Sequence, residues 1–313
     1  MRGRWMMATL AAAVVLVASA TPAVARGDGN GVDETHLPVG KTVTKPTVGG
    51  LWTCQTTFNG GGASTTGPWF NGDGTFDKTK KYHVDGSVAW PNASFKISKS
   101  GGKRVFTSND LPIDHTTGTF PIASTSDAYK VDRNPNSIKA QTLSLSVPLN
   151  PKAAGAPSCV AGEVGILKSG VALFDAVDAG GRDAVAYEVQ DSCDGHPQNT
   201  GEYHYHSVSS CVLAKLDSGT GRSKLVGWAY DGYGIYGPRD AHGKVLSSAD
   251  LDVCHGITSK VKFNGRLQRI YHYVATADYP YTVGCFHGTS SLNGPTGGNP
   301  GGGPPGGGPP PTP

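Results

Sequence analysis

The chain has 313 residues, of which 37% are hydrophobic and 16% are charged, with a formal net charge of +3. Its lysines and arginines are spread along the sequence and form no cluster or stripe, so the composition gives no support for nucleic-acid binding. Beyond the first 25 residues no apolar run is long enough to cross a bilayer, so we expect no integral membrane segment in the mature protein.

The N-terminal residues have the pattern of an export signal. Arg2 and Arg4 precede a short apolar run, and Ala23-Val24-Ala25 fits a signal-peptidase site. Residues 1–25 are therefore predicted to be a secretory signal peptide, and the protein is predicted to be secreted.

Three further segments differ in composition. Residues 26–50 are polar and poor in aromatic side chains, so we expect a flexible leader. Residues 291–313 are rich in glycine and proline and are predicted to form a disordered tail. The middle of the chain, 51–290, is long enough for one large domain with a core of its own.

Most of this middle segment has the pattern of β-strands. Leu143, Leu145 and Val147 alternate with polar residues, which is typical of a half-buried strand. Val185, Tyr187 and Val189 alternate in the same way and predict a strand at 185–189. Segments bounded by turn residues predict further strands at 163–167, 171–174, 225–230, 269–275 and 282–286. A short helix is expected only at 247–253, with a serine cap. We therefore predict an all-β fold, a mainly antiparallel sandwich or distorted barrel with few short helices.

One stretch concentrates residues that bind metals. Asp191-Ser192-Cys193-Asp194-Gly195-His196-Pro197 is followed by Tyr203-His204-Tyr205-His206. Side chains i and i+2 of a strand point to the same face, so His204 and His206 should stand side by side with the tyrosines on the opposite face. His196, on the preceding loop, is predicted to fold over them as a third ligand.

A weaker version of this stretch follows later in the chain. Asp252-Val253-Cys254-His255-Gly256 resembles the first motif, and Tyr271-His272-Tyr273-Val274 resembles the second with valine in the last place. The two units suggest an internal duplication whose halves face each other across one site. On this interpretation His272 is the fourth metal ligand.

Two more tyrosine- and glycine-rich motifs complete a family resemblance. They are Ala229-Tyr230-Asp231-Gly232-Tyr233-Gly234-Ile235-Tyr236-Gly237 and Tyr279-Pro280-Tyr281-Thr282-Val283-Gly284-Cys285-Phe286-His287-Gly288. Together with the Tyr-His-Tyr-His motif they resemble the YHYH domain, over a region from about Trp52 to Gly288. The resemblance implies a secreted or periplasmic domain without a settled activity.

Six cysteines without a Cys-x-x-Cys pair indicate disulfides in an exported chain. Fifteen connectivities are open to six cysteines. The two similar units suggest that Cys193 pairs with Cys211 and Cys254 with Cys285, each closing one unit. Cys54 and Cys159 are then left to pair with each other.

The predicted site allows four interpretations. With the cysteines in disulfides, histidine nitrogens are the expected ligands, and such a set suits zinc or copper. A zinc enzyme would use Glu202 or Asp231 as the general base toward an extracellular ester, amide or glycoside. Copper would instead favour redox chemistry or storage. In the third interpretation the histidines are structural and form hydrogen bonds only to backbone carbonyls. In the fourth the protein is a non-catalytic module that binds cell-surface polysaccharide in a tyrosine-lined cleft, because nine of the twelve tyrosines lie between 203 and 281. The expected partner is thus an extracellular polymer or small-molecule substrate.

Overall fold

The computed structural model describes residues 26–27, 31–58 and 60–290. The predicted signal peptide (1–25) and the glycine- and proline-rich tail (291–313) lie outside these residues. Among the helices of the described segments, none has the length and hydropathy needed to cross a bilayer.

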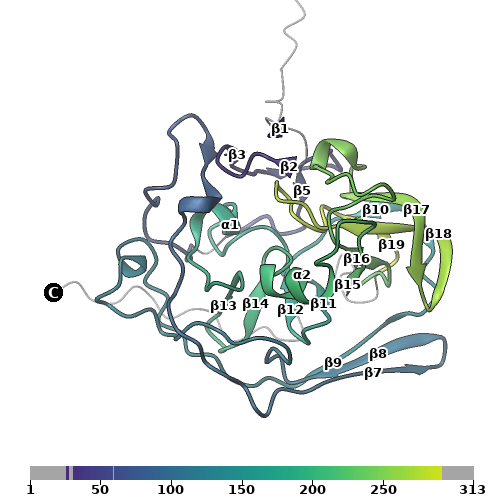
Figure 1. Ribbon diagram of the computed structural model, residues 1–313, viewed down its shortest axis with the longest axis horizontal. Coiled ribbons are helices and arrows are strands. Elements are labelled where there is room, and N and C mark those ends of the chain that lie inside the picture. Colours follow the sequence, from purple (N-terminus) through teal and green to yellow (C-terminus); the bar gives the residue numbers. More distant parts are fainter. Residues whose placement is uncertain (1–25, 28–30, 59, 291–313) are drawn as a thin grey trace, which may run out of the picture.

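A mixed sheet of eight strands forms the centre of the fold (Figure 1). Its order is β13-β14-β12-β11-β15-β16-β18-β17. The strands are β11 (Glu163–Leu167), β12 (Ala172–Phe174), β13 (Gly195–Pro197), β14 (Tyr203–Tyr205), β15 (Leu225–Ala229), β16 (Gly234–Tyr236), β17 (Gly256–Phe263) and β18 (Arg266–Val274).

The sheet consists of two runs of four strands with the same pairing. In the first run β11 is antiparallel to β12, β12 is parallel to β14, and β14 is antiparallel to β13. In the second run β15 is antiparallel to β16, β16 is parallel to β18, and β18 is antiparallel to β17. The runs meet through the antiparallel pair β11–β15. The equivalent strands β11 and β15 are therefore neighbours at the centre, whereas β13 and β17 lie at opposite edges of the sheet.

Smaller sheets and short helices surround this centre. A three-stranded sheet at the lower right of Figure 1 contains β7 (Phe95–Ser100), β8 (Lys103–Ser108) and β9 (Leu143–Pro148). The two-stranded pairs are β1 (Arg26–Gly27) with β2 (Gly31–Val32), β3 (Leu37–Pro38) with β6 (Thr75–Phe76), β4 (Thr42–Val43) with β5 (Leu51–Trp52), and β10 (Ala153–Ser158) with β19 (Phe286–Gly288). The helices are α1 (Ala184–Tyr187), α2 (Ser210–Leu216) and the 3₁₀ turns η1 (Lys78–Lys80), η2 (Ala128–Lys130) and η3 (Ser248–Asp250).

The prediction of a mainly β, disulfide-stabilised fold is confirmed. The disulfides join Cys54 to Cys159, Cys193 to Cys211 and Cys254 to Cys285, as the two similar units suggested. The last two bonds occupy equivalent places in the two runs, because Cys193 and Cys254 lie in the turns that lead into β13 and β17.

Two of the predicted strands are wrong. Residues 185–189 enter helix α1, because the Asp183 side chain accepts a hydrogen bond from the Ala186 backbone and caps the first turn. Residues 282–286 are mostly turn, and β19 begins only at Phe286. The helix expected at 247–253 is reduced to the turn η3, with Ser247 and Asp250 forming its capping box.

The core extends into the segment expected to be a flexible leader. Leu37 is fully buried in the main hydrophobic cluster, and β3 and β4 pair with strands of the domain. The Gly40 backbone also donates to Asp183 at 2.8 Å. From residue 31 on, this segment is thus part of the fold.

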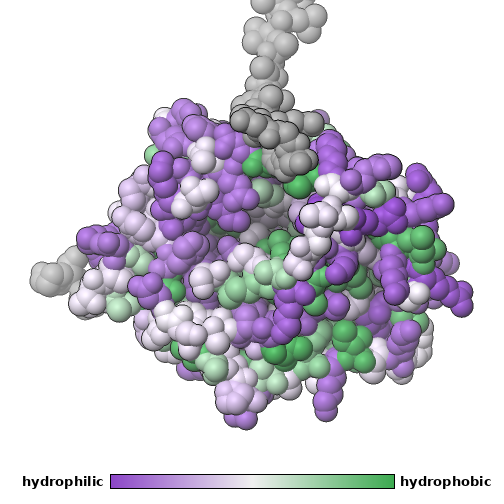
Figure 2. All heavy atoms as spheres, in the orientation of Figure 1, coloured by the Kyte–Doolittle hydropathy of each residue, from purple (hydrophilic) through white to green (hydrophobic). Residues whose placement is uncertain are grey.

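On the face in Figure 2 hydrophilic side chains predominate and hydrophobic ones form small groups.

Candidate functional site

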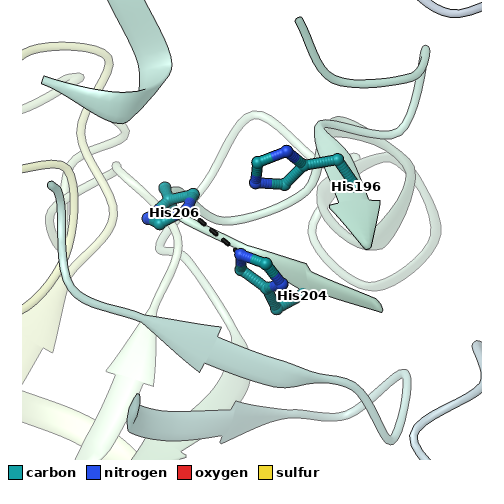
Figure 3. A group of neighbouring side chains, drawn as sticks. All are labelled: His196, His204 and His206. Atoms are coloured by element: carbon teal, nitrogen blue, oxygen red, sulfur yellow. Dashed lines mark hydrogen bonds between the residues drawn. The ribbon is translucent and has the colours of Figure 1, made fainter. Parts of the chain in front are cut away.

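Three histidines meet at one end of the central sheet (Figure 3). His196 lies in β13 directly opposite His204 in β14, and His206 follows β14 on the same side as His204. One ring nitrogen of each lies within 4.8 Å of the others, and the Nε2 atoms of His204 and His206 are 3.2 Å apart. The structure thus brings together His204 and His206, which the strand spacing predicted to be neighbours, and His196, which was predicted to fold over them.

Backbone carbonyls fix the orientation of two rings. His204 Nδ1 donates to the Glu202 carbonyl at 3.2 Å, and His206 Nδ1 donates to the Asp175 carbonyl at 2.6 Å. A carbonyl oxygen only accepts, so the proton of each neutral ring is on Nδ1 and Nε2 carries a lone pair. This is the arrangement found around metal-binding histidines, whose second nitrogen is held by a carbonyl or carboxylate.

Burial keeps these rings uncharged. Loss of solvation, followed by the proximity of His206, lowers the pKa of His204 to about 3. Burial lowers the pKa of His206 to about 4 and that of His196 well below its usual value. Two neutral rings therefore point lone pairs at each other across 3.2 Å, a contact that is repulsive unless a cation lies between them.

Glu188 is the site residue that the sequence did not indicate. Its Oε2 lies 3.4 Å from His196 Nε2 and 3.5 Å from His206 Nε2, and this oxygen has no hydrogen-bond partner among the described residues. Burial and the nearby carboxylates of Asp132 and Asp178 raise its pKa. An anion in this position is disfavoured unless a cation compensates its charge.

Helix α1 positions this carboxylate. The helix ends at Tyr187, and the buried amine of Lys81 donates to the Glu188 carbonyl at 2.9 Å and to Gln190 Oε1 at 2.9 Å. Lys81 also donates to the Val185 carbonyl. These bonds satisfy the last carbonyls of the helix and fix the chain that carries Glu188.

Three separations between these atoms are close to those of a tetrahedral metal site, and the compact group of donors is formed by the three histidines. Zinc bound to nitrogen and oxygen at about 2.0–2.1 Å separates its ligand atoms by about 3.3 Å. The separations of 3.2 Å between His204 and His206, and of 3.4 and 3.5 Å from Glu188, are close to this value. The four residues border a cavity of about 700 Å³, which also reaches Asn134.

His272 does not belong to this group, so its assignment as fourth ligand is wrong. It lies in β18, where its Nδ1 donates to the Ile270 carbonyl at 3.1 Å and its ring contacts Tyr236. Four strands separate β14 from β18, which places His272 roughly 24 Å from His204 along the sheet at about 4.8 Å per strand. The two units are related across β11–β15 and do not face each other over one site.

Local contacts show which residues of the two runs are equivalent. Tyr203 donates to Asp191 at 2.8 Å and Tyr271 donates to Asp252 at 3.0 Å. The two aspartates begin the turns that lead into β13 and β17. His196 pairs with His204, and Ile257 pairs with His272. The second run therefore has isoleucine at the place of His196 and, one residue after Tyr273, valine at the place of His206.

In the second run the positions equivalent to His196 and His206 are apolar. Val274 packs with Leu246 and Leu251 in a small cluster, and Ile257 packs against it. The same strand pairing thus forms with aliphatic side chains at the places of His196 and His206, while His272 stands at the place of His204. The fold does not require histidines at the first two places, which argues against a purely structural role for His196 and His206.

The two predicted catalytic carboxylates do not line the cavity. Glu202 accepts a hydrogen bond from Gln198, and burial together with Glu163 raises its pKa to about 7. Only its backbone carbonyl touches the site. Asp231 accepts hydrogen bonds from Tyr273 at 2.6 Å and from the Gly288 backbone at 2.9 Å. The Glu202 side chain is engaged by Gln198 and Asp231 braces a turn in the second run, so the structure brings neither of the two predicted general bases to the cavity at the histidines.

The tyrosine-lined cleft is also absent from the described residues. The nine tyrosines between 203 and 281 are all at least 94% buried, so their rings belong to the core and do not line a common cleft. Several of them donate to buried aspartates, as Tyr281 does to Asp183 at 2.8 Å.

Comparison with known protein families agrees with the resemblance that the Tyr-His-Tyr-His motif indicated. Residues 144–245 match the family model described as YHYH protein, which spans the first run and the start of the second. This part of the chain therefore carries a YHYH domain. No curated protein and no solved structure matches the chain.

Proposed function

We infer that the protein is an exported metal-binding protein that holds one zinc or copper ion through His196, His204, His206 and Glu188. The observation that carries this proposal is the 3.2 Å contact between two Nε2 lone pairs whose Nδ1 protons are committed to backbone carbonyls. A cation at this point turns the repulsion into two bonds.

The donor set supports zinc or copper over other metals. Three imidazoles and one carboxylate are nitrogen-rich, whereas calcium and magnesium prefer oxygen ligands. All six cysteines are in disulfides, so no thiolate is present to favour a softer ion. The disulfides also support export, because such bonds persist in oxidising compartments.

Elemental analysis tests this proposal. Protein produced without a metal-affinity tag is loaded with zinc or copper(II), freed of excess ion and measured by mass spectrometry of the metal. We expect about one ion per chain. The double variant His204→Ala/His206→Ala should retain a folded circular dichroism spectrum and less than a tenth of the metal. Full metal retention by the double variant would refute the ligand assignment.

A metal-dependent hydrolase is the second candidate function, favoured by the cavity of about 700 Å³ that reaches the triad. A bound ion would supply Lewis acidity toward a substrate carbonyl or a water molecule. Asn134 and Gln198 line the same cavity and offer neutral hydrogen-bonding groups to an extracellular substrate. A panel of ester, amide and glycoside substrates tests this: hydrolysis by the loaded protein that chelation abolishes supports an enzyme, and equal rates with and without metal exclude one.

A further inference from the structure

We propose that a second cavity, remote from the histidines, binds a sugar-sized organic polyanion that carries phosphate or sulfate esters. This basic cavity has a volume of about 560 Å³ and shares no lining residue with the cavity at the histidines. Six cationic side chains line it, and no aspartate or glutamate does. They are Lys99, Arg104, Lys168, Arg222, Lys224 and Lys262.

The cations come from separate parts of the chain. Lys99 and Arg104 belong to the β7–β8 hairpin, Lys168 follows β11, and Lys262 lies in β17. Lysine and arginine repel one another when gathered in this way, and folding gains nothing from it. In the described part of the chain the ion pairs of lysine and arginine are made by other residues, so these six charges have no carboxylate partner.

Arg104 is the least ordinary member of the group. Only 4% of it is exposed, and its guanidinium lies between the rings of Trp228, at 4.7 Å, and Phe263, at 5.5 Å. Its one side-chain hydrogen bond goes to the neutral Asn264 amide at 2.6 Å. A buried guanidinium without a counterion is costly, and an anion bound in the cavity would compensate it.

Three N–H donors in the cavity lining have no hydrogen-bond partner among the residues that the structure describes. They are Arg104 Nε, Arg222 Nε and Trp228 Nε1, and Arg104 and Trp228 are more than nine-tenths buried. Oxyanions accept several hydrogen bonds at once, so they suit a set of convergent donors of this kind.

The size and charge of the cavity define the ligand class. The positive charge of six cationic side chains is larger than one carboxylate group on a ligand would neutralise. Phosphate and sulfate esters offer more negative charge and more acceptor oxygens. A cavity of about 560 Å³ is within the range of small-molecule sites and is far larger than one free oxyanion. The remaining volume therefore accommodates the organic part that carries the esters.

Isothermal titration calorimetry on the full metal-free protein tests the proposal independently of the histidine site. The probes are a sulfated disaccharide, a sugar bisphosphate, the unsulfated disaccharide, and inorganic sulfate and phosphate. We expect at least one of the two ester probes to bind, no binding of the neutral sugar, and at least tenfold weaker binding of the inorganic ions. Affinity should fall as salt is raised, because the attraction is electrostatic.

Substitutions localise the site. The double variant Lys168→Met/Arg222→Met, which leaves the buried Arg104 in place, should lose at least tenfold in affinity. Lys96→Met is the matched control, because Lys96 lies on the same strand as Lys99 but does not line the cavity. Failure of both ester probes to bind, equal binding by the double variant, or equal binding of the inorganic ions would overturn the proposal.

Discussion

Glu188 Oε2 lies 3.4 Å from His196 Nε2, and neither atom makes a hydrogen bond to another described residue. The two residues come from different elements, since Glu188 follows helix α1 and His196 lies in β13. A carboxylate and an imidazole held this way, with two more imidazoles beside them, form a set of donors that a single metal ion would join.

Glu188→Gln should weaken metal binding by at least tenfold, because the amide keeps the shape of the side chain but removes its charge. Competition with a chelator of known affinity measures the change. Glu202→Gln is the control, since the Glu202 carboxyl accepts from Gln198 and does not line the cavity, while its backbone carbonyl holds His204. If both variants bind metal as tightly as the parent protein, Glu188 is not a ligand.

His206→Ala and His272→Ala form a matched pair. Both histidines are buried to the same degree, with 4% of each exposed, and both rings donate to a backbone carbonyl. His206→Ala should reduce the bound metal at a concentration that saturates the parent protein, whereas His272→Ala should leave the stoichiometry unchanged. Metal analysis of the two variants decides this, and equal losses would contradict the assignment.

The histidines of the site should contribute a loss of stability when the metal-free protein is acidified. Burial lowers the pKa of His204 to about 3 and of His206 to about 4, while unfolded histidines titrate near 6.5. At these two residues the unfolded chain therefore binds more protons between about pH 6.5 and about pH 4, and their contribution to the free energy of unfolding falls as the pH decreases through this window.

Urea unfolding of the metal-free protein between pH 7 and pH 4 measures this slope. His206→Gln should flatten it, because the glutamine does not titrate. An unchanged slope in the variant would show that His206 is accessible to protons in the folded state.

Gly195→Ala should destabilise the site. A Cβ atom at Gly195 would lie 2.2 Å from Tyr203 Cζ, so the ring that anchors Asp191 would have to move. We expect a loss of roughly 1–3 kcal/mol in the free energy of unfolding and weaker metal binding, because the adjacent His196 shifts with the strand. Gly219→Ala, where a Cβ atom meets nothing within 4 Å, is the control, and thermal and chemical unfolding of both variants measure the difference.

Local patterns predicted part of this site from the sequence alone. The convergence of His204 and His206 depends only on strand geometry, and the disulfides of the two units follow from the repeated motifs. Glu188 was missed because Val185, Tyr187 and Val189 alternate as in a strand, although Asp183 before an alanine-rich turn is a helix cap. The misplacement of His272 has another cause: recognising the repeat does not reveal how β11 and β15 join the two units, which is a long-range contact.

X-ray absorption spectroscopy at the edge of the bound metal tests the central claim most directly. The account predicts one zinc or copper ion per chain, surrounded by three imidazole nitrogens and one carboxylate oxygen, with zinc bonds of about 2.0–2.1 Å. A protein that takes up no ion under saturating zinc or copper, or an ion whose spectrum lacks imidazole scattering, would contradict it.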